Sequence, residues 1–127
     1  MSSSGLIYLA SPYSSDDPRV ANWRWRAVCR AAARMMSQGK FIISPVAHTH
    51  PIAQAGNLPY GWDYWQRYDY LLIDACDEVY VLTIDGWDSS IGVGYEVQYA
   101  QSTGKPVTYI DEYGREVSVD SELSIKQ

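Results

Sequence analysis

One carboxylate, Glu96, follows a segment rich in small residues and is the strongest candidate for chemistry in this sequence. The segment Asp88-Ser-Ser-Ile-Gly-Val-Gly-Tyr-Glu96 links a short expected strand at 78–82 to a helical pattern. Backbone N–H groups at a helix start lack intrahelical partners and suit an anion such as phosphate. Gly92 and Gly94 would let the backbone approach such a group closely. The order strand, loop, helix therefore predicts an anion site with Glu96 just beyond it.

A second carboxylate, Asp69, falls on the inward side of another expected helix. The apolar residues around it keep helical spacing, and they are Trp62, Trp65, Tyr68, Leu72, Ile73 and Cys76. Two acids in one pocket can act as nucleophile and proton donor when their surroundings separate their pKa values. Taken singly, a helical Glu is most often solvated and such an Asp is most often a cap or an ion-pair partner. The hypothesis therefore depends on the pair.

Other residues near these acids are candidates for binding a substrate or its phosphate. They are Ser11, His48, His50, Trp62, Asp88, Ser89, Ser90, Gly92 and Gly94. Asp88 would repel a phosphate and suits a ribose hydroxyl instead. His48 and His50 make an incomplete ligand set, so we expect no metal, and substrate binding or loop packing remains open. Trp62 is a candidate either for stacking on a base or for internal packing.

Short apolar runs alternate with helical patterns along the chain. Strands are expected at residues 6–10, 41–43, 78–82 and 107–110. Three helices are expected between them, whereas residues 46–60 show no sustained period and predict a long loop. This alternation predicts one domain over residues 1–127 with a flavodoxin-like, three-layer α/β/α fold. Its sheet should be mostly parallel, with four or five strands.

The first expected helix begins at Pro18 behind the N-cap candidate Asp17. Its predicted buried stripe is Val20, Trp23, Ala27, Ala31 and Met35. Three arginines recur every four residues on another face and predict a solvated stripe, and they are Arg26, Arg30 and Arg34. Trp25 falls off the buried stripe and is a candidate subunit contact.

The bulk composition excludes some classes of partner. A net charge of -5 works against a nucleic-acid polymer, although it leaves a single nucleotide open. The N-terminus lacks a basic signal region and no apolar run is long enough for a membrane span, so we expect a cytoplasmic protein without a membrane partner. Cys29 and Cys76 form no C-x-x-C pair and are expected to be free thiols.

Three motifs resemble the nucleoside 2-deoxyribosyltransferase superfamily. They are Tyr8-Leu-Ala-Ser-Pro12, Asp69 eight residues before Asp77, and Ser90-Ile-Gly-Val-Gly-Tyr-Glu96 before Gly104-Lys-Pro106. The last looks closest to the 2′-deoxynucleoside 5′-monophosphate N-glycosidases. The resemblance implies a nucleophile at Glu96, a proton donor to the departing base at Asp69, and a tyrosine at Tyr8 that orients Glu96. It also implies phosphate contacts at Ser90 and Gly92, no cofactor, and a homodimer or larger homo-oligomer.

These residue types suit the cleavage of an N-glycosidic bond in a nucleoside or nucleoside 5′-monophosphate. A carboxylate facing C1′ can stabilise positive charge on the sugar and trap it as an ester, while an acid with a raised pKa protonates the base. Water or a second base could take the sugar, so hydrolase and transferase both remain open. The histidine loop and the aromatic cluster at 60–65 depart from the family pattern and leave the base open.

Two other functions remain alternatives. A nucleotide-binding or sensor domain without turnover could use the same fold and the same helix start, because a fold does not fix a function. A phosphoribohydrolase also uses a helical glutamate, but the sequence lacks a Gly-Gly-x-Gly-Thr run.

Overall fold

The computed structural model describes residues 4–119. Its elements, in chain order, are β1 (Leu6–Ala10), α1 (Pro18–Ser37), β2 (Phe41–Ile43), α2 (Pro45–Gly56), α3 (Trp62–Ala75), β3 (Glu78–Leu82), the 3-10 turn η1 (Trp87–Ser89), α4 (Ile91–Ser102) and β4 (Val107–Ile110). No helix within these residues combines the length and hydrophobicity that crossing a membrane requires.

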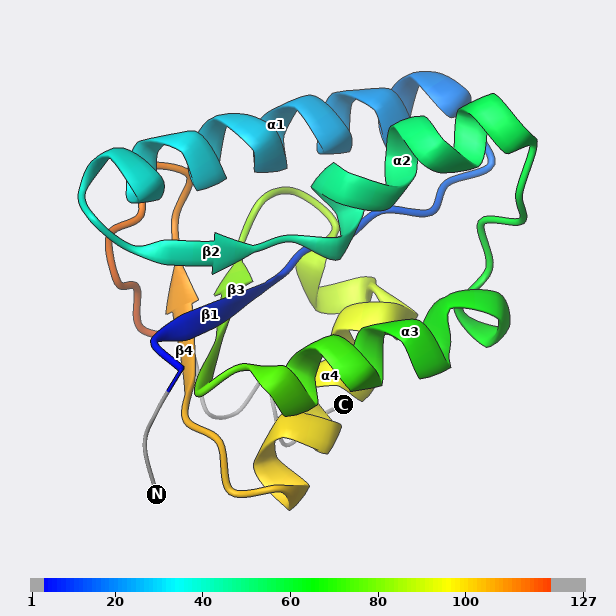
Figure 1. The fold of residues 1–127 in the computed structure, drawn as a ribbon. Helices are drawn as coiled ribbons and strands as arrows, with labels where there is room; N and C mark the ends of the chain where they lie inside the picture. Colours follow the sequence, from blue (N-terminus) through cyan, green and yellow to red (C-terminus); the bar gives the residue numbers. More distant parts are fainter. Residues whose placement is uncertain (1–3, 120–127) are drawn as a thin grey trace.

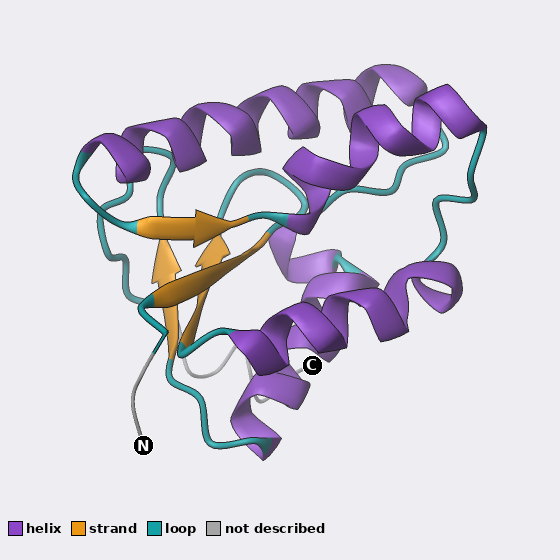
Figure 2. Ribbon diagram, viewed as in Figure 1, coloured by secondary structure: helices purple, strands orange, loops and turns teal. Residues whose placement is uncertain are grey.

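The four strands form one parallel sheet in the order β2-β1-β3-β4. Helices α1 and α2 cover one face of this sheet, and α3 and α4 cover the other (Figure 1). Figure 2 shows the same three layers coloured by secondary structure. The expected three-layer, flavodoxin-like α/β/α fold is confirmed. In this strand order the chain reverses direction across the sheet at β1 and β3, and such a switch point opens a crevice at the carboxyl ends of the strands.

Strand β1 lies in the middle of the sheet and sends alternate side chains to opposite layers. Ile7 and Leu9 pack with the side chains of α1 in one core. Tyr8 and Ala10 pack with Ile73 and other residues from α3 and α4 in a second core. The strand period therefore places the Tyr8 ring in the layer that contains both candidate acids.

Helix α1 begins as expected, because Asp17 caps it and Pro18 is its first residue. The predicted buried stripe is confirmed at Ala27, Ala31 and Met35, whereas Val20 is half-buried and Trp23 is 46% exposed. Trp25, expected at the surface, is instead partly buried against the core, and its indole N–H donates to the carbonyl of Ala47 at 3.3 Å. The predicted exposure of the two tryptophans is reversed because helix α2 covers Trp25 and leaves Trp23 in solvent.

Helix α2 replaces the long loop predicted for residues 46–60. Ser44 caps this helix by accepting from the N–H of Ala47 at 3.0 Å, and Pro45 is at its first turn. The buried positions have helical spacing, but two of them, Thr49 and His50, are polar and hide the apolar period. Pro51 lies inside the helix, although proline usually ends or kinks a helix, and it therefore favoured the prediction of a loop.

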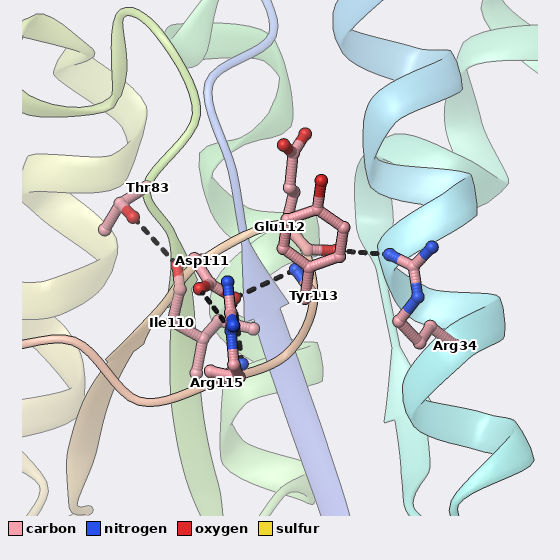
Figure 3. A network of polar contacts seen from close by, with 7 residues as sticks. All are labelled: Arg34, Thr83, Ile110, Asp111, Glu112, Tyr113 and Arg115. Carbon is pink, nitrogen blue, oxygen red and sulfur yellow. Dashed lines mark hydrogen bonds and ion pairs between the residues drawn. The ribbon is translucent and has the colours of Figure 1, made fainter.

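The expected turn after β4 is held by polar contacts from several elements (Figure 3). The Asp111 carboxylate accepts from the N–H groups of Tyr113 and Arg115, both at 2.9 Å, and from Nε of Arg115. Arg34 of α1 donates to the carbonyl of Glu112 at 2.9 Å. The arginine stripe of α1 is otherwise exposed, as predicted, and Arg34 fastens the turn to the helix.

Candidate functional site

The two candidate acids meet in the layer between the sheet and helices α3 and α4. Glu96 is 4% exposed and Asp69 is 9% exposed. The hydroxyl group of Tyr8, fully buried on β1, donates a hydrogen bond to Oε2 of Glu96. Asp69 lies close enough to Glu96 and Tyr8 for the three groups to influence one another's ionisation. Residues from three elements thus form one buried cluster.

Burial controls the ionisation of this cluster. It raises the pKa of Asp69 to about 6, although hydrogen bonds from Glu96 and Tyr8 oppose the rise. Burial also raises the pKa of Glu96 well above its usual range, and repulsion by Asp69 adds to the effect, whereas the Tyr8 hydroxyl opposes it. Two carboxyl groups this close cannot both ionise freely, so the pair keeps one proton near neutral pH. The Tyr8 donor favours the negative charge on Glu96.

The start of helix α4 offers unpaired donors beside the acids. Ser90 caps the helix, and its hydroxyl oxygen accepts from the N–H of Val93 at 3.2 Å. Among the described residues, the N–H groups of Ile91 and Gly92 have no hydrogen-bond partner. A helix start with free N–H groups and a serine hydroxyl suits an anionic oxygen group.

A cavity of about 410 Å³ joins the acids to this helix start. Its volume lies in the range of small-molecule sites. Residues of the loops after β1 and β3 and of all four helices line it, among them Ser11, Arg24, Thr49, Tyr60, Trp62, Trp65, Asp69, Ser89, Ser90, Gly92 and Glu96. The cavity therefore lies at the switch point of the sheet, and it reaches from the carboxyl pair to the surface.

Three polar atoms of lining residues are buried without a hydrogen-bond partner among the described residues. They are Oγ of Ser11, Nε of Arg24 and Nε1 of Trp62. Buried polar groups in folded proteins are almost always paired, so each of these atoms marks a place for a ligand or a water molecule. Arg24 and Trp62 can only donate, which favours a ligand rich in acceptor oxygens.

Several predicted site residues lie elsewhere. Asp88, Gly94 and His48 are exposed and do not belong to the cavity lining. His50 is buried behind the lining, and its Nδ1 bonds the hydroxyl of Tyr13 at 2.6 Å. Burial lowers the pKa of His50, which favours the neutral ring. Of the two histidines, only His50 is linked to the cavity, through Tyr13.

Trp62 both lines the cavity and packs against α4. Its ring stacks on Tyr95 with 5.8 Å between centroids and an angle of 3° between planes. A Cβ at position 92 would lie 3.4 Å from Cε3 of Trp62, so the indole ring packs directly against the backbone of the helix start. Trp62 thereby covers one side of the first turn of α4.

Three further residues line the cavity that were not predicted from the sequence, namely Arg24, Tyr13 and Tyr60. Arg24 could have been identified from the expected order of strands and helices. Helix α1 runs back from the carboxyl end of β1, so its first turns must lie at the edge of the sheet where ligands bind. Helical spacing, by contrast, draws attention only to the three exposed arginines further along that helix.

Two remaining predictions concern metals and thiols. Within residues 4–119, there is no group of three or more His, Cys, Asp or Glu side chains placed to hold a metal ion. Cys29 and Cys76 are free thiols, as predicted.

Comparison with known proteins gives a family but no activity. No curated protein matches the sequence. A family model described as "Domain of unknown function (DUF1937)" matches residues 5–112, which is most of the chain, and the protein therefore belongs to this family.

Proposed function

We propose that this protein cleaves the N-glycosidic bond of a nucleoside or nucleoside 5′-monophosphate through a covalent glycosyl-Glu96 ester. The observation that carries the proposal is the buried pair of Glu96 and Asp69, which lines a ligand-sized cavity and in which Glu96 accepts a hydrogen bond from Tyr8. Burying two carboxyl groups together costs stability, and such pairs are typical of sites that need one acid and one base.

The chemistry divides between the two acids. In the reactive form of the pair, the one shared proton is on Asp69 and Glu96 is ionised. The ionised oxygen of Glu96 attacks C1′ as the bond from C1′ to the base nitrogen breaks, and the proton of Asp69 goes to the leaving base. Water, deprotonated by Asp69, then attacks C1′ and releases Glu96 and the free sugar. If a second base enters instead, its nitrogen takes the sugar and the reaction is a transfer. Tyr8 holds Glu96 in place and stabilises its charged form.

The resemblance of the segments at Tyr8, Asp69 and 90–96 to the nucleoside 2-deoxyribosyltransferase superfamily supports the same assignment. The roles implied by that resemblance fall on the residues that share the buried cluster and the adjacent helix start. The unpaired donors at Ile91 and Gly92 suit the phosphate of a nucleotide.

The test is a panel of ribo- and deoxyribonucleosides and their 5′-monophosphates, with free base measured by chromatography. We expect base release by the wild type and no detectable release by a folded Glu96→Ala variant. Glu112→Ala is a matched control, because Glu112 is exposed on the turn after β4. If the wild type binds nucleotides and releases no base, the protein is a nucleotide-binding or sensor domain. Adding a second free base distinguishes transfer from hydrolysis.

We further propose that the protein acts as a homodimer or larger homo-oligomer. Large apolar side chains near the mouth of the cavity are exposed, with Tyr64 at 50%, Ile91 at 68% and Tyr95 at 46%. Aromatic residues gathered on a surface are typical of subunit interfaces. Light scattering should give at least twice the mass of one chain, and a monomer at working concentration would contradict this proposal.

A further inference from the structure

We propose that Arg24 of helix α1 binds the anionic oxygen group of the ligand and makes the 5′-phosphate a requirement for tight binding. This inference rests on the proposed function, in which the ligand is a nucleoside or nucleotide. It adds a side-chain cation to a site that otherwise consists of main-chain N–H groups and serine hydroxyls.

The guanidinium group of Arg24 is fixed by the chain before α1. Its Nη1 donates to the carbonyl of Ser14 at 2.8 Å and, more weakly, to that of Tyr13 at 3.5 Å. Carbonyl groups orient an arginine without neutralising its charge. Within residues 4–119, Arg24 forms no ion pair with a carboxylate. Its Nε is buried and has no partner among the same residues. A fixed, unneutralised cation with a free donor therefore lines the cavity.

Gly86 lets this cation reach the loop that leads to helix α4. A Cβ built on Gly86 would lie 2.4 Å from Nη2 of Arg24, so any larger residue would displace the guanidinium group. The backbone there has a φ of +93°, which also favours glycine. The carbonyl of Gly86 accepts from the hydroxyl of Ser89 at 3.3 Å. Arg24 therefore lies against the loop that leads to the unpaired N–H groups at the start of α4.

A buried hydroxyl points to the same occupant. Ser11 is 7% exposed, lines the cavity, and has no partner for its Oγ among the described residues. Together with Arg24 and the α4 start, it provides donors from three segments of the chain. A phosphate presents several acceptor oxygens and binds arginine through paired hydrogen bonds. Arg24 also lines a second hollow together with Asp17 and Asp85, but neither carboxylate forms an ion pair with it among the described residues.

The experiment separates phosphate recognition from turnover. Calorimetry in a Glu96→Gln background measures binding of a deoxynucleoside 5′-monophosphate and of the corresponding deoxynucleoside. We expect Arg24→Gln to weaken binding of the monophosphate by about 10- to 100-fold, the range for a lost charged hydrogen bond, and to leave binding of the nucleoside within about 3-fold. Arg26→Gln is the matched control, because Arg26 is exposed two residues along the same helix.

A second variant keeps the proposal testable if Arg24→Gln does not fold. Gly86→Ala keeps Arg24 but pushes its guanidinium group aside, and it should cause the same selective loss. In addition, inorganic phosphate should raise the melting temperature of the wild type and of Arg26→Gln, but not that of Arg24→Gln.

Three results would overturn the assignment of Arg24. They are equal weakening of nucleotide and nucleoside, no weakening of either, and no preference of the wild type for the phosphorylated ligand. Failure of the proposed function gives a different pattern. If no base is released while Arg24→Gln still loses the monophosphate selectively, the enzyme assignment is wrong and the assignment of Arg24 stands.

Discussion

The hydroxyl group of Tyr8 donates to Oε2 of Glu96, although 88 positions separate the two residues in the sequence. Tyr8 occupies the central strand and Glu96 the second turn of the last helix. Burial and the nearby carboxyl groups raise the pKa of Tyr8 well above its usual range, so its hydroxyl stays protonated and remains a donor. This contact gives the buried Glu96 a fixed orientation and a partner for its charge.

Removing that donor should change how Glu96 ionises. In Tyr8→Phe the carboxylate loses a hydrogen bond, so its pKa rises further and the acid limb of the kcat/KM profile moves to higher pH. We expect a loss of about 10- to 100-fold in kcat, with little change in KM, because one hydrogen bond to a charged group is worth roughly 1.5–3 kcal/mol. The measurement is the pH profile of both proteins. An unchanged acid limb would show that Tyr8 only fills space.

Asp69→Asn should remove general acid catalysis. Bases that leave as poor anions should be released about 10²–10⁴ times more slowly. A 7-methylated purine carries a positive charge and leaves without a proton, so its release should fall much less. Rates for both classes of base distinguish a proton donor from a binding residue, because a binding role would slow both equally. Asp63→Asn, at an exposed position on the same helix, is the control.

The same substitution should make the stability of the folded protein less sensitive to a rise in pH. The pKa of Asp69 is raised by burial from 3.8 to about 6, so the folded state holds this proton more tightly than the unfolded chain. The resulting stabilisation is complete below about pH 4 and is lost as the pH rises to about 6. Relative to the wild type, Asp69→Asn should gain roughly 1–3 kcal/mol in the free energy of unfolding between pH 4 and pH 7.5.

Urea unfolding at the two pH values measures that difference. Comparing the variant with the wild type removes the contributions of other groups, such as Asp17 and Asp111, whose pKa values are lowered by neighbouring donors. A constant difference between the two proteins at both pH values would contradict the raised pKa of Asp69.

Helix α2 depends on its cap. The Ser44 side chain is buried and accepts from the N–H of Ala47, so Ser44→Ala should cost about 1 kcal/mol in the free energy of unfolding. Ser37→Ala is a suitable control, because Ser37 is exposed and its hydroxyl donates to a carbonyl of its own helix. Equal stability of the two variants in urea would indicate that the cap contributes little.

The sheet and three of the helices could be predicted from the sequence because their signals are local. Residues 6–10 are apolar throughout, and residues 79–82 form a similar run after Glu78, which is typical of strands buried on both faces. Asp17 and Pro18 mark the start of α1 by their chemistry alone. Helix α2 was missed because its buried face includes Thr49 and His50, so the pattern of apolar residues does not show the period.

Site residues that belong to one sequence motif could be predicted, whereas residues that only the packing of the chain brings to the cavity could not. Glu96, Ser90 and Gly92 belong to one segment, and the structure places all three at the cavity. Arg24 was missed because its role depends on Gly86, 62 residues away, and no local pattern links the two positions. Asp88 and Gly94 are in the same motif as Glu96, but the helical turn directs them to solvent.

The most direct test of the account is the mass of the protein during turnover. Wild-type protein mixed with a deoxynucleoside 5′-monophosphate, quenched rapidly in acid and digested should show a peptide containing Glu96 that carries one deoxyribosyl phosphate group. The Glu96→Gln variant should show no such adduct. An adduct on a different residue, or rapid base release with no adduct under any quench time, would contradict the proposal that Glu96 is the nucleophile.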